Sequence, residues 1–428
     1  MSPTFSSLGI RNYRVYASGA IVSNIGTWMG RVAQDWLVLT VLTDHSASAL
    51  GLVTGLQFLP FLLLAPWAGM LVDRFPKRRI LFLTQSSLLV TALLLAVLTA
   101  MGVVQLWQVY LLAFIQGVAT AVDNPARQTF VSEMVDTDHL PNAVALNSAS
   151  FNLGRLVGPG VAGLVIAAVG ISPALFVNAA SFLFVMMALA RMNSAALTPS
   201  PRARGKGQIR EGLRYVRSRP DLILIMALVF VLGTFGMNFQ MTMALMATKV
   251  FDKGAGEFGL LGSIMAVGSL AAALMSARRA RPRLRVLVVA LVGFTVSTAL
   301  LATAPTFLLF GLYLVPTGLA ALTALTTANA MVQISVDPMM RGRVMALYMA
   351  IFMGGTPIGA PMIGWIGDVW GPRWTIAIGT VMVGLSVIAV MVWITRRENV
   401  SVDFQTRRRP RFRVRLTSEV PAAPEVAK

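Results

Sequence analysis

The sequence predicts an all-α integral membrane protein with twelve transmembrane helices in two pseudo-symmetric bundles of six. Three observations predict this class: the mean hydropathy of the 428-residue chain is +0.72, only 12% of its residues are charged, and apolar stretches of about 20 residues recur along almost the whole length. Twelve such stretches use about 240 positions and leave only short connections. The composition therefore excludes a large soluble domain.

The apolar spans fall into two sets separated by a polar segment. We expect a first bundle over 1–192, a linker over 193–220, a second bundle over 221–395 and a basic tail over 396–428. The apolar residues Ile209, Leu213 and Val216 recur at helical spacing and predict a short amphipathic surface helix at the end of the linker. The spans are expected at 16–42, 49–72, 80–101, 107–121, 143–169, 173–192, 222–247, 258–277, 286–304, 307–328, 344–366 and 374–394.

The positions of the basic residues predict the orientation of the chain. With the N-terminus in the cytoplasm, 31 of the 36 Lys and Arg lie on the inner side, which is the positive-inside asymmetry. We therefore expect both termini and the linker to be cytoplasmic. The net charge of +19 is then a topology signal and does not indicate nucleic-acid binding. The arginines of the tail, Arg407 to Arg415, are expected to meet anionic lipid headgroups.

An internal repeat relates the two sets of spans. Shifting the sequence by 201 positions aligns spans four and five with spans ten and eleven. The alternative is chance among the many Gly and Ala of apolar sequence, although shared Asp and Phe residues in one register argue for a repeat. The aligned pairs are Asp136 with Asp337, Phe151 with Phe352, Gly154 with Gly355, Gly158 with Gly359 and Gly163 with Gly364.

Several kinds of chemistry have no residues to support them. The chain has no cysteine, and both histidines, His45 and His139, fall in polar connections. No glycine-rich loop ends in Gly-Lys-Ser or Gly-Lys-Thr, so no site for ATP hydrolysis is predicted. We expect no metal, no cofactor and no enzymatic activity.

The connection after span two carries a small residue, a carboxylate and a basic cluster. Physically, Gly69 allows close helix approach, and Asp73 can accept hydrogen bonds from the N-terminus of a neighbouring helix or from arginines. The segment, which includes Arg74, Lys77 and Arg78, resembles the loop signature of the major facilitator superfamily. The resemblance implies that these residues hold one conformation closed. A simple positive-inside stop signal remains the alternative.

Span five carries a stripe of glycines interrupted by a proline. Gly154, Gly158 and Gly163 present a flat surface for a neighbouring helix, and Pro159 frees a carbonyl group and can bend the helix. The stripe resembles the Gly-Pro signature that exporters of the major facilitator superfamily carry on this helix, which implies export rather than uptake. A pure packing stripe remains the alternative.

Further segments narrow the resemblance to one branch of the superfamily. The chain is similar to the enterobactin-exporter and macrolide-efflux-like branch over most of residues 8–396. This implies the major facilitator fold, a bacterial cytoplasmic-membrane location, and export of a lipophilic or amphiphilic small molecule by a monomer. The segments that carry it are Arg11–Arg14, Ser23–Trp28, Ala33–Leu37, Leu59–Pro60, Asn124–Gln128 and Leu156–Pro159.

Proton coupling needs a group inside the membrane that changes its protonation state. Of the 17 acidic residues only Asp35 lies well within an expected span, with Arg31 one helical turn away and Arg155 as the other intramembrane cation. Burial disfavours a charged carboxylate and a nearby arginine favours it, so a carboxylate whose arginine contact alternates can load and release a proton. A static pair of Arg31 and Asp35 is the alternative, and Asp123, at the inner end of span four, is the second candidate.

Three functions stay open at this point. The sequence favours a secondary transporter that exports its substrate by alternating access in exchange for protons. A facilitator-type importer and a non-transporting sensor or assembly protein are the alternatives. The small-molecule substrate itself is not defined by these motifs.

Overall fold

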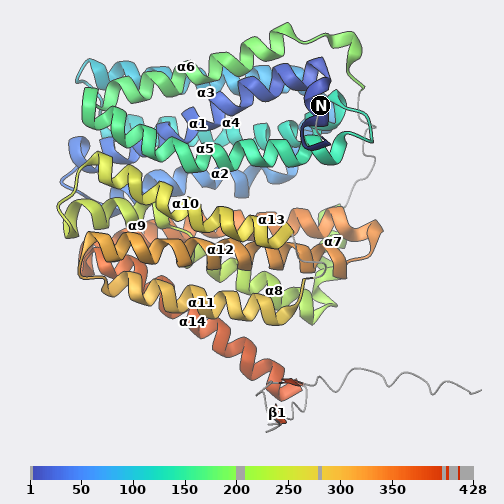
Figure 1. Cartoon of the computed structure of the whole chain (residues 1–428), viewed down its shortest axis with the longest axis vertical. Coiled ribbons are helices and arrows are strands. Elements are labelled where there is room, and N and C mark those ends of the chain that lie inside the picture. The colour runs from blue at the N-terminus through green and yellow to red at the C-terminus, as the bar shows by residue number, and fades with distance from the viewer. Residues whose placement is uncertain (1–2, 199–207, 278–281, 398–401, 404–412, 415–428) are drawn as a thin grey trace, which may run out of the picture.

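The computed structural model describes residues 3–198, 208–277 and 282–397 and two short strands, β1 (Val402–Asp403) and β2 (Arg413–Val414), which pair antiparallel. The predicted headgroup-binding arginines of the tail fall outside the described residues, apart from the backbone of Arg413. The helices, shown in Figure 1, are α1 (Arg11–Leu37), α2 (Ala47–Arg74), α3 (Lys77–Ala100), α4 (Leu106–Met134), α5 (Leu140–Val169), α6 (Ile171–Arg191), α7 (Gln208–Arg217), α8 (Pro220–Val231), α9 (Phe239–Leu245), α10 (Ala255–Ala277), α11 (Leu284–Thr303), α12 (Phe307–Ser335), α13 (Pro338–Trp370) and α14 (Pro372–Arg397). Short 3-10 helices η1 (Pro3–Gly9) and η3 (Ser194–Ala196) and π-helical turns η2 (Val38–Leu42), η4 (Leu232–Gly236) and η5 (Met246–Val250) complete them.

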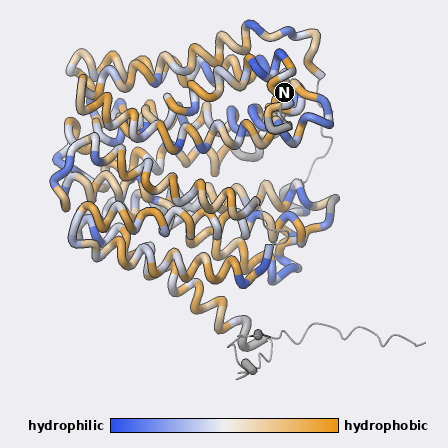
Figure 2. Tube along the Cα trace, viewed as in Figure 1, coloured by the Kyte–Doolittle hydropathy of each residue, from blue (hydrophilic) through white to orange (hydrophobic). Residues whose placement is uncertain are grey.

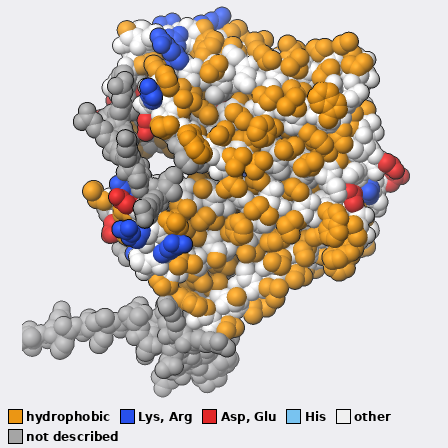
Figure 3. Space-filling model, turned by 180° about the vertical axis from the view of Figure 1, so that it is seen from behind, with side chains coloured by type: hydrophobic (Ala, Val, Ile, Leu, Met, Phe, Trp, Pro, Cys, Tyr) orange, Lys and Arg blue, Asp and Glu red, His pale blue; other side chains and the backbone are white. Residues whose placement is uncertain are grey.

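The helices form a membrane-spanning bundle, as the sequence predicts. In the described part of the chain, eleven helical segments are long and apolar enough to cross a membrane. Helix α1 is not among the eleven because Arg31, Gln34 and Asp35 lower its hydropathy, but it packs lengthwise on α5 and α6 and forms the twelfth span. Apolar residues dominate the middle of the helices and polar residues their ends (Figure 2). Hydrophobic side chains likewise cover the broad middle of the surface in Figure 3.

The seventh span is broken. Helix α8 ends in the π-helical turn η4, and the chain resumes as α9 after Asn238, so one span of 220–250 consists of four short segments. The Asn238 side chain donates a hydrogen bond to the Thr234 carbonyl oxygen at 2.8 Å, which satisfies a carbonyl that the break releases. Gly233 allows the break to lie against α13, because a Cβ there would be 2.7 Å from the carbonyl oxygen of Phe352.

The two halves repeat the same helix packing. In the first half α5 packs on α1, and in the second half α13 packs on η4. The aligned glycines lie at these contacts: a Cβ on Gly158 would be 2.6 Å from Cβ of Trp28, and one on Gly359 would be 1.8 Å from the carbonyl oxygen of Thr234. The next aligned pair, Gly163 and Gly364, meets the first residues of α10 and α2 respectively. The repeat read from the sequence is thus a repeat in space.

The halves contact each other through α2 with α13 and through α5 with α10. We call the end of the molecule that carries the N-terminus, α7 and the α2–α3 connection the linker end (Figure 1). At the opposite end the seam is tight, since a Cβ on Gly364 would lie 2.4 Å from the Ala47 carbonyl oxygen and one on Gly51 the same distance from that of Ala360. At the linker end a Cβ on Gly69 or Gly342 would meet nothing within 4 Å. Figure 3 shows the resulting opening between the halves at that end.

Helix α7 attaches the linker to the second half. Glu211 forms an ion pair with Arg343, and the Tyr215 hydroxyl donates a hydrogen bond to Asp337 Oδ2 at 3.2 Å, so α7 lies on the first turns of α13. Val216 is buried at 5% exposure, whereas Leu213 is exposed. One side of the amphipathic helix expected at the end of the linker therefore packs against the second half, and the other side is exposed.

Candidate functional site

The predicted coupling residues Arg31 and Asp35 lie on the face of α1 that looks toward the second half. Asp35 is 7% exposed, and its side chain faces the amide of Gln240 on α9. The Arg31 guanidinium lies over the rings of Trp28 and Phe58, with 5.0 and 5.8 Å to the ring centroids. Among the described residues, no ion pair within 4 Å joins Arg31 to Asp35. The two side chains interact electrostatically across one helical turn without a direct ion pair, so the choice between a static pair and an alternating contact stays a prediction.

Arg155 lies on the face of α5 that approaches the second half. Pro159 and Gly163, one and two turns further along this face, pack against Gly259 and Gly256 of α10. Phe151, one turn in the other direction, is 51% exposed and makes an edge-to-face contact with Trp28 at 5.9 Å between ring centroids. In the described part of the chain, Arg155 has no ion-pair partner.

Asp123 lies within α4, which continues for eleven residues beyond it toward the linker end. Helix α4 continues to Met134, and along it Asp123 and Glu133 are buried while Asn124 and Gln128 are exposed. Asp123 is 3% exposed; Oδ2 is 3.0 Å from Nη2 of Arg127, and Oδ1 accepts hydrogen bonds from Thr84 and Gln85 at 2.7 and 2.8 Å. Asp123, the second candidate from the sequence, is therefore a carboxylate buried in the first half, and Arg127 balances its charge.

The span-five glycines serve two different neighbours. Gly154 and Gly158 face α1, where a Cβ would lie 2.8 Å from the backbone carbon of Asn24 and 2.6 Å from Cβ of Trp28. Gly163 faces α10, where a Cβ would lie 2.6 Å from the Ala255 carbonyl oxygen. Helix α5 therefore packs on α1 within the first half through one glycine face and on α10 of the second half through another. Larger side chains at these positions would separate the helices.

The residues of the α2–α3 connection divide into two groups. Lys77 forms a buried ion pair with Glu133 at 3.3 Å, and Arg78 donates to the carbonyl oxygens of Leu189 and Ala190 at the end of α6 at 2.8 and 3.3 Å. These two residues bind the start of α3 to α4 and α6 within the first half. By contrast, the structure records no hydrogen bond or ion pair for Asp73 among the described residues, and Arg74 lies exposed over Phe75. Gly69 meets no neighbour at the open linker end.

A carboxylate that the sequence analysis missed closes the opposite end. Asp368, near the end of α13, accepts hydrogen bonds from the backbone N–H groups of Ala47 and Ser48 at 2.7 and 2.8 Å and from the Ser46 hydroxyl at 3.0 Å. It therefore caps the N-terminus of α2 in the other half of the molecule. The internal repeat could have indicated this residue, because the corresponding position of α5 is Ala167. The carboxylate is therefore present at the α2–α13 seam and absent from the equivalent α5–α10 seam.

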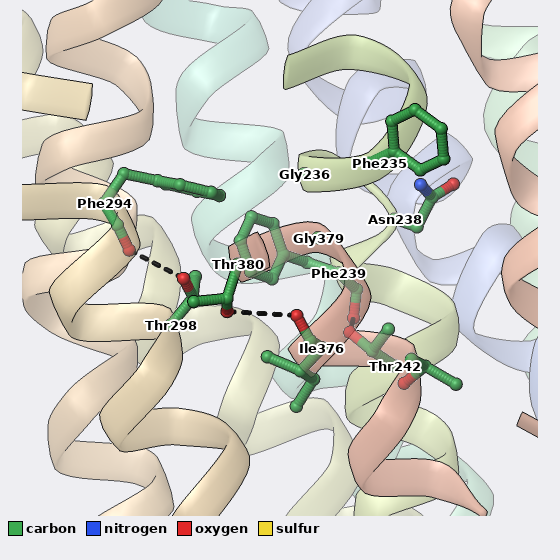
Figure 4. A pocket seen from close by; sticks show the side chains of 11 residues that line it. Phe235, Gly236, Asn238, Phe239, Thr242, Phe294, Thr298, Ile376, Gly379 and Thr380 are labelled. Carbon is green, nitrogen blue, oxygen red and sulfur yellow. Dashed lines mark hydrogen bonds between the residues drawn. The ribbon is translucent and has the colours of Figure 1, made fainter. Parts of the chain in front are cut away.

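A small pocket lies inside the second half, between the broken seventh span, α11 and α14 (Figure 4). Its cavity has a volume of about 10 Å³, which is room for about one water molecule and far below the range of about 300–1,000 Å³ for drug-sized ligands. Threonine hydroxyl groups in the pocket donate hydrogen bonds within their own helices: Thr298 donates to the Phe294 carbonyl oxygen at 2.8 Å, and Thr380 donates to that of Ile376 at 3.1 Å (Figure 4). None of the charged residues described above lines it.

Comparison with known proteins gives the family of this fold and these motifs. The family model for transmembrane secretion effectors matches residues 2–418. The chain belongs to this family of major facilitator transporters. It is therefore a multi-pass membrane transporter of a small molecule and not an enzyme.

The relatives of this transporter include siderophore and drug transporters. The staphyloferrin A transporter of Staphylococcus aureus (strain NCTC 8325 / PS 47) is 27% identical over 380 residues, 88% of this chain and 94% of that protein. The multidrug efflux pump Tap of Mycolicibacterium fortuitum is 27% identical over 392 residues, 87% of this chain and 93% of that protein. The enterobactin exporter EntS of Shigella boydii serotype 4 is 24% identical over 368 residues, 84% of this chain and 85% of that protein.

Solved structures confirm the fold. A bacterial homologue of the human lysosomal transporter Spinster, in an inward-facing and occupied conformation, has a TM-score of 0.70 at 13% identity and covers 90% of this chain and 96% of its own. A single-residue mutant of the nucleoside transporter NupG has a TM-score of 0.71 at 13% identity and covers 89% of this chain and 99% of its own. At these identities the likeness concerns the fold alone.

Proposed function

We propose that this transporter exports a lipophilic or amphiphilic small molecule from the bacterial cytoplasm by alternating access in exchange for protons. The relatives named as an enterobactin exporter and a multidrug efflux pump support the direction. The excess of Lys and Arg at the linker end supports a cytoplasmic location for that end. With this orientation, the structure, closed opposite the linker and open at the linker end, is the inward-facing state.

The observation that carries the proposal is the seam between α2 and α13. The two helices run in opposite directions, so the N-terminus of each lies near the C-terminal end of the other. Asp368 caps the N-terminus of α2 while the outer end is closed. Asp73 lies near the end of α2, on the same seam, and in the described part of the chain it has no hydrogen bond or ion pair while the inner end is open. In the outward-facing state, Asp73 takes the corresponding place at the first turn of α13, so that each state has its own carboxylate cap.

Asp73 accordingly governs conformational exchange and not substrate binding. Asp73→Asn should reduce transport severalfold while the Kd for substrate, measured on purified protein, changes less than about tenfold, or roughly 1.4 kcal/mol. A larger loss of affinity would place Asp73 in the binding site. Asp138→Asn, which removes a carboxylate from the α4–α5 connection, is the matched control and should leave both quantities unchanged.

Asp35 is the proton carrier in this proposal. It is a buried carboxylate at the boundary of the two halves, free of an ion pair in the inward-facing state, with a cation on the next turn of the same helix. Movement of Arg31 toward Asp35 in the other state would favour the charged form and release the proton. Asp123 is already neutralised by Arg127, so it fits a structural role better.

The test is transport into inside-out vesicles driven by a proton gradient. Asp35→Asn should abolish gradient-driven uptake while downhill exchange of substrate continues, because the neutral amide cannot release a proton. Asp44→Asn, at an exposed carboxylate after α1, should transport at the wild-type rate. Gradient-driven uptake at the wild-type rate in Asp35→Asn would eliminate Asp35 as the carrier, and net movement only toward the linker side would establish import.

A further inference from the structure

Where the helices α1 and α5 face the second half, positively charged side chains outnumber negatively charged ones. Arg31 and Arg155 both lie there, and arginine stays protonated in proteins. On the part of that surface near the two arginines, Asp35 is the carboxylate that faces the second half in the described chain, because Asp368 lies at the closed end of the α2–α13 seam and Asp123 is neutralised by Arg127 inside the first half. The local charge is therefore positive whether Asp35 is protonated or ionised. An uncompensated arginine at this depth is costly and marks a functional site.

The two arginines flank one aromatic contact. Trp28 meets Phe151 edge to face, and the Arg31 guanidinium lies over the other side of this cluster, on Trp28 and Phe58. Arg155 follows Phe151 by one turn of α5. Toward the closed end, the same faces of α1 and α5 meet α9 and α10 through Asp35 and Gly163. Trp28, Arg31, Phe151 and Arg155 thus come just before the closed seam, at the head of the opening from the linker end.

We propose that Arg31 and Arg155 form the substrate site, together with Trp28, Phe58 and Phe151, and that the substrate is an amphiphilic anion with one or two carboxylate groups. This inference rests on the proposed transport function and specifies its substrate class. The guanidinium fork matches carboxylate geometry, and the aromatic rings accept the apolar body of the ligand. A cation of similar shape meets net repulsion at the same place. An anion also suits export, because the inside-negative membrane potential drives it outward.

The experiment uses two fluorescent probes with the same aromatic body and opposite charge. Pyrenebutyrate and pyrenebutylamine are titrated onto the full-length protein in lipid nanodiscs, with empty nanodiscs as the background, and binding is followed by fluorescence anisotropy. The wild type should bind the carboxylate at least tenfold more tightly than the amine. Arg31→Gln and Arg155→Gln should each raise the Kd for the carboxylate about tenfold and leave that for the amine unchanged or lower.

The controls separate charge at the site from surface charge and from misfolding. Arg217→Gln removes an exposed arginine of α7 and should change neither Kd. Arg155→Lys keeps the charge without the fork and should lie between Arg155→Gln and the wild type. If one arginine variant unfolds, as judged by its thermal transition, the other carries the test. Equal or tighter binding of the amine, no saturable binding of either probe, or Kd values for the carboxylate within twofold of wild type in the folded arginine variants would overturn the proposal.

Failure of this inference is distinguishable from failure of the export proposal. Binding needs no gradient and no movement, so a protein that binds pyrenebutyrate in an arginine-dependent manner but does not transport it keeps the site and refutes export. A protein that transports pyrenebutylamine out of the cytoplasm without binding the carboxylate keeps export and refutes the site.

Discussion

Removing the carboxylate of Asp368 should open the end opposite the linker, which is the outer end in the proposed orientation. In this structure the side chain accepts three hydrogen bonds from the start of α2, at 2.7, 2.8 and 3.0 Å. When the outer end opens, α2 and α13 separate there and water takes over these donors. The Asp368→Ala variant loses the contacts in the closed state only, so the change appears in the equilibrium between the two states.

The size of the shift follows from the nature of the contacts. Asp368 is exposed, so the values for buried charged hydrogen bonds are too large, and a carboxylate at a helix N-terminus contributes about 0.3–1 kcal/mol through the helix dipole and a lost cap about 1 kcal/mol. Together they give about 1.3–2 kcal/mol, or roughly a ten- to thirtyfold change in the ratio of the two states. An outward-open form populated at about 1% would rise to roughly a tenth to a quarter of the molecules.

The fold should tolerate the change. The Ser46 hydroxyl accepts a hydrogen bond from the Ala49 N–H at 3.2 Å, so α2 keeps a cap of its own. Asp368→Asn retains one acceptor oxygen and should have an intermediate effect.

The assay is a distance measurement between spin labels at the outer end. The native chain has no cysteine, so labels can be placed by Met101→Cys after α3 and Lys253→Cys before α10 without background. The wild type should show mainly a short distance between the two labels. Asp368→Ala should show in addition a longer distance, in the proportion expected for the outward-open form. Asp44→Ala removes an exposed carboxylate at the same end that accepts no recorded hydrogen bond, and it should change nothing. A distance distribution in Asp368→Ala that matches wild type, or an equal shift in Asp44→Ala, would refute the reasoning.

Three further predictions concern topology, the first half and the seam. A cysteine introduced at position 202 of the linker should resist an impermeant thiol reagent in intact cells and react in inside-out vesicles, and labelling in intact cells would reverse the proposed orientation. Lys77→Met removes the buried ion pair with Glu133 and should destabilise the folded protein by about 3 kcal/mol, visible as a lower unfolding midpoint, whereas an unchanged midpoint would show that the pair is not stabilising. Gly364→Leu places a side chain where even a Cβ would be 2.4 Å from the Ala47 carbonyl oxygen, so it should prevent outer closure and stop transport, and wild-type transport would show that the seam is looser than described.

Local sequence signals determined the helical content and the number of spans. Apolar stretches of the length of a membrane can satisfy their backbone groups only as helices, so hydropathy is sufficient to predict them. The repeat could also be read, because Gly154, Gly158 and their partners Gly355 and Gly359 serve the same close packing in both halves. Signals of this kind fail where buried polar residues interrupt a span. Helix α4 extends past the apolar stretch 107–121 to Met134, and Asp123 and Arg127 form an ion pair in this extension.

For the candidate site, the sequence likewise indicated some features and left others to the tertiary structure. The sequence indicated that Asp35, Arg31 and Arg155 are charged residues inside the membrane, since charge at this depth is costly and therefore informative. Their mutual relation depended on tertiary structure: Arg31 lies over aromatic rings and does not pair with Asp35, one turn away. Spacing along a helix shows which residues can meet and leaves open which partner from another helix is preferred.

The sequence by itself determined the membrane class, the twelve spans, the repeat and the motifs that identify the family, because each depends on local composition or on a fixed register along the chain. Only the tertiary structure showed that the molecule is closed at one end and that Asp368 caps a helix of the other half. It also showed that Lys77 and Arg78 bind within the first half, whereas Asp73 has no hydrogen bond or ion pair to any residue that the structure describes. These features join residues up to about 320 positions apart. Such contacts depend on how two bundles are placed against each other, and the same sequence makes different ones in each state of the transport cycle.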